Sequence, residues 1–178
     1  DLATNPERKC VYVAPFRALV AEVEQSLTPT FSALGIPVAS LYGGSETNDL
    51  EIRLAEIAQI IVGTPEKLQA VLAYEGKSLS EFGTVVLDEG HLLDSGSRGF
   101  SFELQLSKLR KELQKSTRTL FLSAVLPNSD DIAAWLGGSS ETLASNPWSP
   151  TFRRVGILTW PVNRQSRLVY VRADGQAH

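Results

Sequence analysis

Two adjacent carboxylates, Asp88 and Glu89, follow the apolar run 84–87, and His91 comes two residues later. Such a β-branched run predicts an inner strand of a mostly parallel sheet, and ligands of these sheets bind beyond the carboxyl ends of the strands. In phosphoanhydride hydrolysis one carboxylate holds Mg²⁺, usually through water, and another orients or deprotonates the attacking water. His91 would then report the state of the site to a neighbouring element through a hydrogen bond. The alternative is that Asp-Glu-Gly only ends the strand and starts a turn.

Composition predicts one globular domain over residues 1–178, because 43% of the residues are hydrophobic and 21% are charged. No segment approaches the ~18 consecutive apolar residues of a membrane span, and no secretory signal opens the chain. We therefore expect a cytoplasmic protein with no membrane partner. Position 1 is Asp1, and methionine is missing from the whole chain, which predicts a piece of a longer protein.

The formal net charge of −3 argues against a protein that coats nucleic acid unselectively. From residue 150 onward, five arginines stand against one aspartate. This end of the chain is either a modest basic patch or an ordinary solvated surface.

Hydrophobic periodicity predicts elements that can position the carboxylates. Strands are expected at 9–14, 38–42, 60–62, 82–87 and 119–122, and helices from Pro15 and at 49–58, 65–72, 102–113 and 128–136. Helix 49–58 should turn Ile52, Leu54 and Ile57 partly into the core, and Asn128 and Ser129 should cap the last helix. Residues 139–165 read as a loop, and a last strand follows at 167–172. The alternation predicts an α/β fold with an open, mostly parallel sheet and helices on both faces, in three layers.

Two helix starts carry a cation where the helix dipole favours an anion. Arg17 follows Pro15, and Lys67 follows Pro65, with the hydroxyl of Thr64 beside it. A bound phosphate would reverse the penalty, because free amides, dipole and cation would converge on it. The pair predicts a track for a polyanion along the sheet edge that carries Asp88, while ordinary first-turn cations remain the alternative.

Five segments, each at the end of an expected strand, resemble motifs of the superfamily 2 DExH-box helicases in their order and spacing. They are residues 14–19 (Ala-Pro-Phe-Arg-Ala-Leu), 43–44 (Gly-Gly), 63–67 (Gly-Thr-Pro-Glu-Lys), 88–91 (Asp-Glu-Gly-His) and 123–128 (Ser-Ala-Val-Leu-Pro-Asn). They match motif Ia, a glycine pair, and motifs Ib, II and III, over about residues 9–136. The resemblance implies a RecA-like fold of the P-loop NTPase type, and it is strongest to the large processive helicases.

The resemblance also implies a role for each matching residue. Asp88 would bind Mg²⁺ with ATP, Glu89 would activate the hydrolytic water, and His91 would couple to Ser123 and Ala124 of motif III. Six residues would contact the backbone of a nucleic-acid single strand: Pro15, Arg17, Gly43, Gly44, Thr64 and Lys67. Motif III commonly ends in threonine, which Val125 replaces here, so one hydroxyl is missing from the expected coupling network.

The phosphate loop of the family would precede residue 1, and a second RecA-like domain would supply the other half of the ATP cleft. We therefore expect most of the first motor domain of an ATP-dependent nucleic-acid helicase, inactive as a fragment. A double-strand DNA translocase or remodelling ATPase shares these motifs, and a non-catalytic nucleic-acid-binding scaffold is the third alternative. RNA and DNA are not distinguished, because backbone contacts are common to both.

Overall fold

The computed structural model describes residues 2, 5, 7–43, 46–74, 81–94, 96–112, 116–126, 128–144, 155–160 and 167–171. The chain divides into two compact units, Asp1–Thr142 and Leu143–His178, and each is described by itself. The assignment of all 178 residues to one domain stays a prediction.

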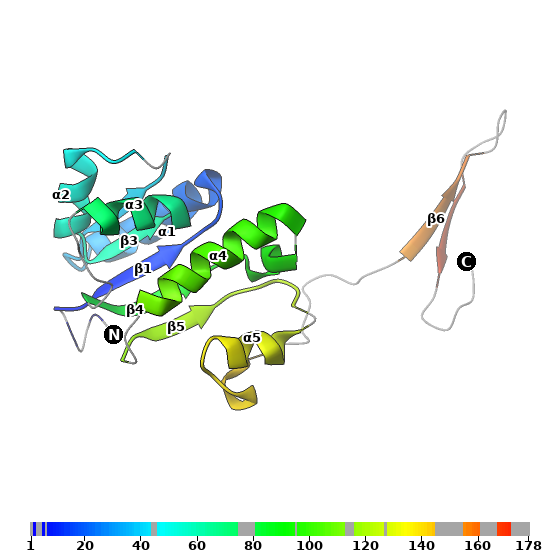
Figure 1. The fold of residues 1–178 in the computed structure, drawn as a ribbon. Helices are drawn as coiled ribbons and strands as arrows, with labels where there is room; N and C mark the ends of the chain where they lie inside the picture. Colours follow the sequence, from blue (N-terminus) through cyan, green and yellow to red (C-terminus); the bar gives the residue numbers. More distant parts are fainter. Residues whose placement is uncertain are drawn as a thin grey trace. The chain divides into compact units, whose positions relative to one another are not determined.

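Five parallel strands form the sheet of the first unit (Figure 1). They are β1 (Lys9–Val13), β2 (Val38–Leu41), β3 (Ile60–Gly63), β4 (Phe82–Leu87) and β5 (Arg118–Phe121). Their spatial order is β2-β3-β1-β4-β5, and every neighbouring pair is parallel. Parallel neighbours need crossover connections, which the helices provide. The predicted open parallel sheet of an α/β protein is therefore confirmed.

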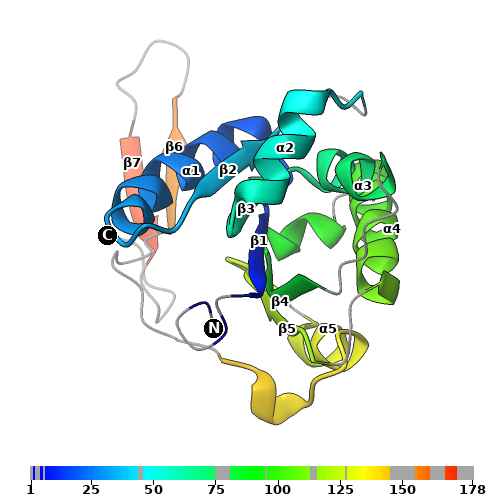
Figure 2. The ribbon, with the colours of Figure 1, turned by 90° about the vertical axis from the view of Figure 1, so that its left-hand side faces the viewer.

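Helices cover both faces of this sheet, as the sequence predicts. They are α1 (Arg17–Ser32), α2 (Asp49–Ile57), α3 (Pro65–Tyr74), α4 (Gly96–Glu112) and α5 (Ser129–Trp135), with two short 3-10 helices, η2 (Gly90–Asp94) and η3 (Ser140–Thr142). Figure 2 shows α1 on one side of the sheet and α3 and α4 on the other. The result is a three-layer α/β/α arrangement.

Alternation along β1 divides the core between the two faces. Val11 and Val13 are fully buried in a cluster with Leu106 of α4, whereas Ala14 is fully buried in a second cluster with Val20 of α1. An inner strand buried on both sides reads as a continuous apolar run, and for this reason the strand could be recognised from sequence. Packing of the two clusters on the two faces of the sheet thus fixes the position of the inner strands.

Helix α2 contradicts part of the predicted core. Ile52 and Ala55 are buried, but Leu54 is exposed and Ile57 is 68% exposed. The buried pair is spaced by three residues on one stripe of a nine-residue helix, and the other two side chains lie off that stripe. The prediction that Leu54 and Ile57 enter the core is wrong.

Helix α5 begins after Asn128 as predicted, but the Asn128 side chain makes no capping hydrogen bond. Asp130 and Asp131 lie in the first turn and place negative charge at the positive end of the helix. The prediction that the Asn128 side chain caps α5 is therefore wrong. The start of this helix is instead stabilised by the charges of the two first-turn carboxylates.

The second unit contains an antiparallel pair, β6 (Val155–Thr159) and β7 (Arg167–Val171). Strand β7 agrees with the predicted last strand. Strand β6 corrects the loop expected at 139–165, and its register pairs Val155 with Val171 and Thr159 with Arg167.

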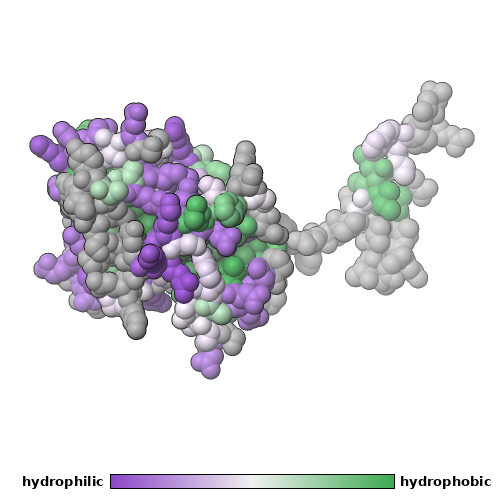
Figure 3. Space-filling view, viewed as in Figure 1, coloured by the Kyte–Doolittle hydropathy of each residue, from purple (hydrophilic) through white to green (hydrophobic). Residues whose placement is uncertain are grey.

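Surface hydropathy is mixed on the face that Figure 3 shows, where small hydrophobic areas alternate with hydrophilic ones over the coloured residues of the first unit. Among the helices of the described ranges, none is long and apolar enough to cross a membrane.

Candidate functional site

The parallel register aligns the carboxyl ends of all five strands along one side of the sheet, which is called the sheet edge here. Val13 is level with Gly63 and with Leu87, and Leu87 is level with Phe121. The residues that follow these strands therefore share this edge: Ala14 and Pro15 after β1, Tyr42 and Gly43 after β2, Thr64 after β3, Asp88 after β4 and Ser123 after β5. The predicted gathering of the motif residues at one sheet edge agrees with the register.

The Asp88 carboxylate is held by two hydrogen-bond donors. Its Oδ1 accepts from the backbone N–H of Glu89 at 2.7 Å, and its Oδ2 accepts from the hydroxyl of Tyr12 at 2.5 Å. The backbone N–H of Asp88 donates to the carbonyl of Val13 at 2.9 Å, so the end of β4 is also tied to β1. An ionised carboxylate has about four acceptor positions, and these contacts leave room for further ligands.

Tyr12 is a site residue that the motifs did not reveal. Burial, the hydrogen bond to Asp88, and the negative charges of Asp88 and Glu89 all raise the pKa of Tyr12 above its ordinary value. The hydroxyl is therefore a stable donor at neutral pH. The sequence feature that could have revealed Tyr12 is its hydroxyl, a polar group within the apolar run of β1. The pairing of β1 with β4 brings this position near Asp88.

Glu89 adopts a backbone conformation that is rare for a residue with a side chain. Its φ is +59°, and it is the only non-glycine residue of the described ranges with a positive φ. Such a conformation costs of order 1–3 kcal/mol and is concentrated at functional sites. The Glu89 Oε2 lies 3.0 Å from Nδ1 of His91, so these two motif residues contact each other.

Gly90 lies directly against the ring of Phe121 on β5. A Cβ atom at this position would lie 2.1 Å from Cε1 and 2.4 Å from Cζ of Phe121. The backbone N–H of Gly90 also donates to the carbonyl of Leu122 at 2.8 Å. The glycine of the Asp-Glu-Gly-His segment thus lets the chain pass directly beside β5.

The expected hydrogen bond between His91 and Ser123 is not formed in the described part of the chain. The Ser123 hydroxyl donates to the carbonyl of Val125 at 3.1 Å, and His91 pairs with Glu89. A coupling role for Ser123 and Ala124 stays a prediction, but it does not rest on a direct contact with His91.

A cavity of about 740 Å³ opens beside His91. It is lined by His91, Leu93, Glu103, Val125, Leu126, Asn128, Asp131, Ile132 and Trp135. It therefore lies among η2, α4, α5 and the segment after β5, and neither Asp88 nor Glu89 lines it. The guanidinium of Arg110 stands 5.6 Å from the ring centroid of Trp135, a cation–π contact that anchors α5 to α4.

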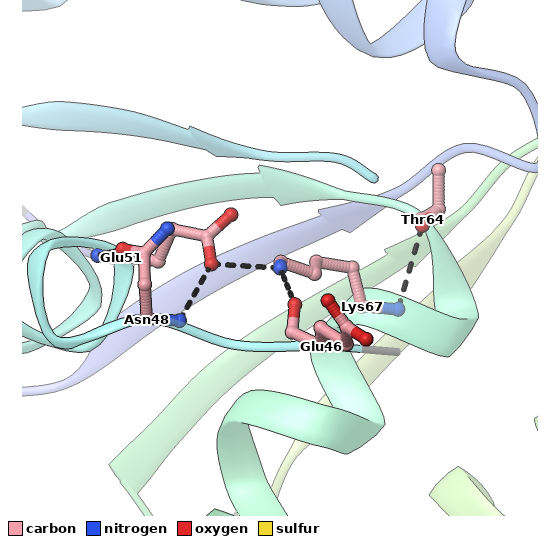
Figure 4. Close-up of polar contacts among 5 residues, drawn as sticks. All are labelled: Glu46, Asn48, Glu51, Thr64 and Lys67. Atoms are coloured by element: carbon pink, nitrogen blue, oxygen red, sulfur yellow. Dashed lines mark hydrogen bonds and ion pairs between the residues drawn. The ribbon is translucent and has the colours of Figure 1, made fainter. Parts of the chain in front are cut away.

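Lys67 differs most from its predicted role (Figure 4). Its side chain is only 3% exposed, and its Nζ lies 2.7 Å from Oε2 of Glu51 and donates to the carbonyl of Glu46. Glu51 also accepts from the N–H of Asn48, whose side chain caps α2 in return. Lys67 is therefore the centre of a buried ion-pair network and not a free cation at a helix start.

Thr64 is likewise buried. Its Oγ1 accepts from the backbone N–H of Lys67 at 3.4 Å, in the position of a cap for α3 (Figure 4). Arg17, by contrast, is exposed at the start of α1, which has no acidic residue in its first turn and no side-chain cap. Gly43 has a φ of +139°, and Gly44 lies outside the described residues.

The Asp88 carboxylate fits the way in which proteins commonly hold magnesium. In the ranges that the structure describes, no group of three or more His, Cys, Asp or Glu side chains converges. Mg²⁺ keeps several waters and commonly takes one or two carboxylates together with substrate phosphates. Asp88, with both oxygens oriented and acceptor positions left, suits that mode of binding.

Comparison with known proteins gives a consistent result. The family model described as DEAD/DEAH box helicase matches residues 2–132. Hachiman protein HamB of Bacillus cereus is 37% identical over 159 residues, which are 89% of this chain and 14% of that protein. The ATP-dependent DNA helicase Hel308 of Methanocella arvoryzae is 34% identical over 151 residues, which are 84% of this chain and 20% of that protein. The chain thus spans a fifth or less of these two relatives.

A solved structure supports the fold. The crystal structure of a hypothetical ATP-dependent RNA helicase from Sulfolobus tokodaii matches with a TM-score of 0.62 and 24% sequence identity. The match covers 74% of this chain and 39% of that one. The first unit therefore has the expected RecA-like α/β fold.

Proposed function

This chain belongs to the DEAD/DEAH box helicase family, and on that premise we propose that it forms most of the first RecA-like motor domain of an ATP-dependent nucleic-acid helicase. ATP hydrolysis would drive closure of a cleft between this domain and a second RecA-like domain while both hold one strand. The longer protein would act in the cytoplasm.

The observation that carries the proposal is the geometry of Asp88 and Glu89 at the end of β4. Asp88 is oriented through both carboxylate oxygens and would hold the magnesium that accompanies ATP. That ion would neutralise charge on the phosphates. Glu89 is displayed by its left-handed backbone beside Asp88 and would orient or deprotonate the attacking water.

The nucleic-acid strand would follow the same sheet edge. Arg17 is exposed at an uncapped helix start, where free amides and the dipole favour a phosphate. Pro15, Gly43, Gly44 and Thr64 would contact the backbone of that strand. Lys67 would support this edge indirectly, because its ammonium is engaged by Glu51. These contacts go to the strand backbone, whose phosphates RNA and DNA share.

Arg17→Ala in the longer protein tests the track. We expect weaker single-strand binding for every sequence alike and a salt dependence whose slope falls by about 1, since one phosphate contact is removed. Arg53→Ala is the matched control, because Arg53 is exposed on α2, in another part of the first unit. Loss of affinity for only some sequences, or equal effects of the two variants, would contradict the track.

Two assays separate the alternatives. A double-strand translocase or remodelling ATPase would show nucleic-acid-stimulated ATP hydrolysis without strand separation on RNA and DNA duplexes. A non-catalytic scaffold would bind a single strand and hydrolyse no ATP.

A further inference from the structure

Tyr12 and Asp88 meet because of the register between β1 and β4. Tyr12 is level with Val86, and Asp88 comes two residues after Val86, directly beyond Leu87, the last residue of β4. A tyrosine ring that leans along the strand direction spans that separation, and its hydroxyl reaches Oδ2 of Asp88 at 2.5 Å. The contact therefore follows from the pairing of β1 with β4, which the hydrogen bond from the N–H of Asp88 to the carbonyl of Val13 extends by one residue.

The two donors to Asp88 differ in origin. The N–H of Glu89 is a local contact between adjacent residues, whereas the Tyr12 hydroxyl comes from a separate strand. A local bond alone leaves the carboxylate free to turn about its own side-chain bonds. The hydroxyl of Tyr12 removes that freedom, because it fixes the second oxygen from outside the motif.

We propose that Tyr12 is a positioning residue for magnesium: its hydroxyl holds the Asp88 carboxylate in the one orientation that receives the Mg²⁺ of Mg-ATP. This inference rests on the proposed function. Tyr12 touches neither ATP nor water in this role and acts through Asp88. The aromatic ring packs against the buried cluster that contains Ala14, Val20 and Val62, so the ring supports the core while the hydroxyl serves the site.

Tyr12→Phe separates these two contributions, since phenylalanine keeps the ring and deletes the hydroxyl. Tyr74→Phe is the matched control, because Tyr74 is the last residue of α3, a helix that begins after β3 at this sheet edge and runs away from it. In the longer protein, the Mg²⁺ concentration that gives half-maximal ATP hydrolysis should rise about tenfold in Tyr12→Phe, as expected when a hydrogen bond to a charged group is lost. The kcat at saturating Mg²⁺ should change less than about twofold, and Tyr74→Phe should leave both values unchanged.

Ultraviolet resonance Raman spectroscopy of the 178-residue chain reads the hydroxyl directly. The difference between the wild type and Tyr12→Phe should contain the tyrosine doublet of a hydroxyl that donates strongly to a carboxylate. A doublet typical of a solvated tyrosine would overturn the proposal. An unchanged Mg²⁺ requirement in an enzyme that hydrolyses ATP normally would also overturn it, and would leave the proposed function intact. A wild-type protein that contains a complete ATP site but hydrolyses no ATP would instead refute the proposed function, and with it any role of Tyr12 toward magnesium.

Discussion

The buried ion pair of Lys67 and Glu51 gives a prediction with a definite asymmetry. The Lys67 side chain is 3% exposed, and the Glu51 side chain is 21% exposed. Glu51→Gln would leave a buried ammonium without its counter-charge, with only the carbonyl of Glu46 and a neutral amide oxygen as acceptors. We expect a cost of about 3 kcal/mol in the free energy of unfolding, the low end of the range for breaking a buried pair.

Lys67→Met should cost less, about 1–2 kcal/mol. The methionine keeps most of the apolar stem, and the Glu51 carboxylate left behind is exposed enough to regain water and still accepts from the N–H of Asn48. The double variant should cost less than the sum of the two single variants, with a coupling of at least about 1 kcal/mol, because the partners contact each other.

Urea unfolding of the four proteins in this cycle measures all three quantities. Lys108→Met, on the exposed face of α4, is the control for loss of one lysine charge and should change stability by less than about 0.5 kcal/mol. The reasoning fails if Lys67→Met is the more damaging single variant, or if the costs of the two single variants simply add.

Three further predictions concern Glu51, Gly90 and Glu89. Burial alone would raise the pKa of Glu51, but the hydrogen bond from Lys67, a backbone N–H and the charge of Lys67 hold that pKa below its usual range. The stability that this carboxylate provides is complete above an unfolded-state pKa of about 4.3 and is lost as the pH falls toward the lower folded-state pKa. Urea midpoints between pH 6 and pH 3 should therefore fall more steeply in the wild type than in Lys67→Met. Gly90→Ala should destabilise the chain by about 1–3 kcal/mol through overlap with the Phe121 ring, and Phe121→Leu in the same chain should recover part of that loss; an unaltered urea midpoint in Gly90→Ala would show that the ring moves freely. Glu89→Gln in the longer protein should retain Mg-ATP binding and lower the hydrolysis rate by roughly two to four powers of ten, and near-normal turnover would exclude Glu89 as the general base.

Strands were predictable from sequence because the inner strands of this sheet are buried on both faces. β3 contains Ile60, Ile61 and Val62, all buried, and no polar alternation obscures such a run. Strand β6 was missed for the opposite reason. It belongs to a two-stranded unit with exposed Ile157 and Leu158, so its identity depends on pairing with β7 and not on a local pattern of burial.

The partner of Lys67 could not be predicted from the sequence. A cation in the first turn of α3 is unfavourable when only the helix dipole is considered, and a phosphate is then the obvious partner. The actual partner, Glu51, is on α2, and Thr64 turns inward to accept from the N–H of Lys67. Both facts depend on the packing of α2 beside α3, which no local pattern encodes.

The orientation of the two site carboxylates is set by strands outside the motif that contains them. Tyr12 of β1 holds Asp88 from one side, and Phe121 of β5 leaves space only for a glycine at Gly90, directly after the left-handed Glu89. A substitution at Tyr12 or Phe121 would therefore change the geometry of the site, although the Asp-Glu-Gly-His sequence itself would be unchanged. On the proposed role of Tyr12, two chains with the same motif would differ in magnesium requirement if they differed at the residue that corresponds to Tyr12 on the neighbouring strand.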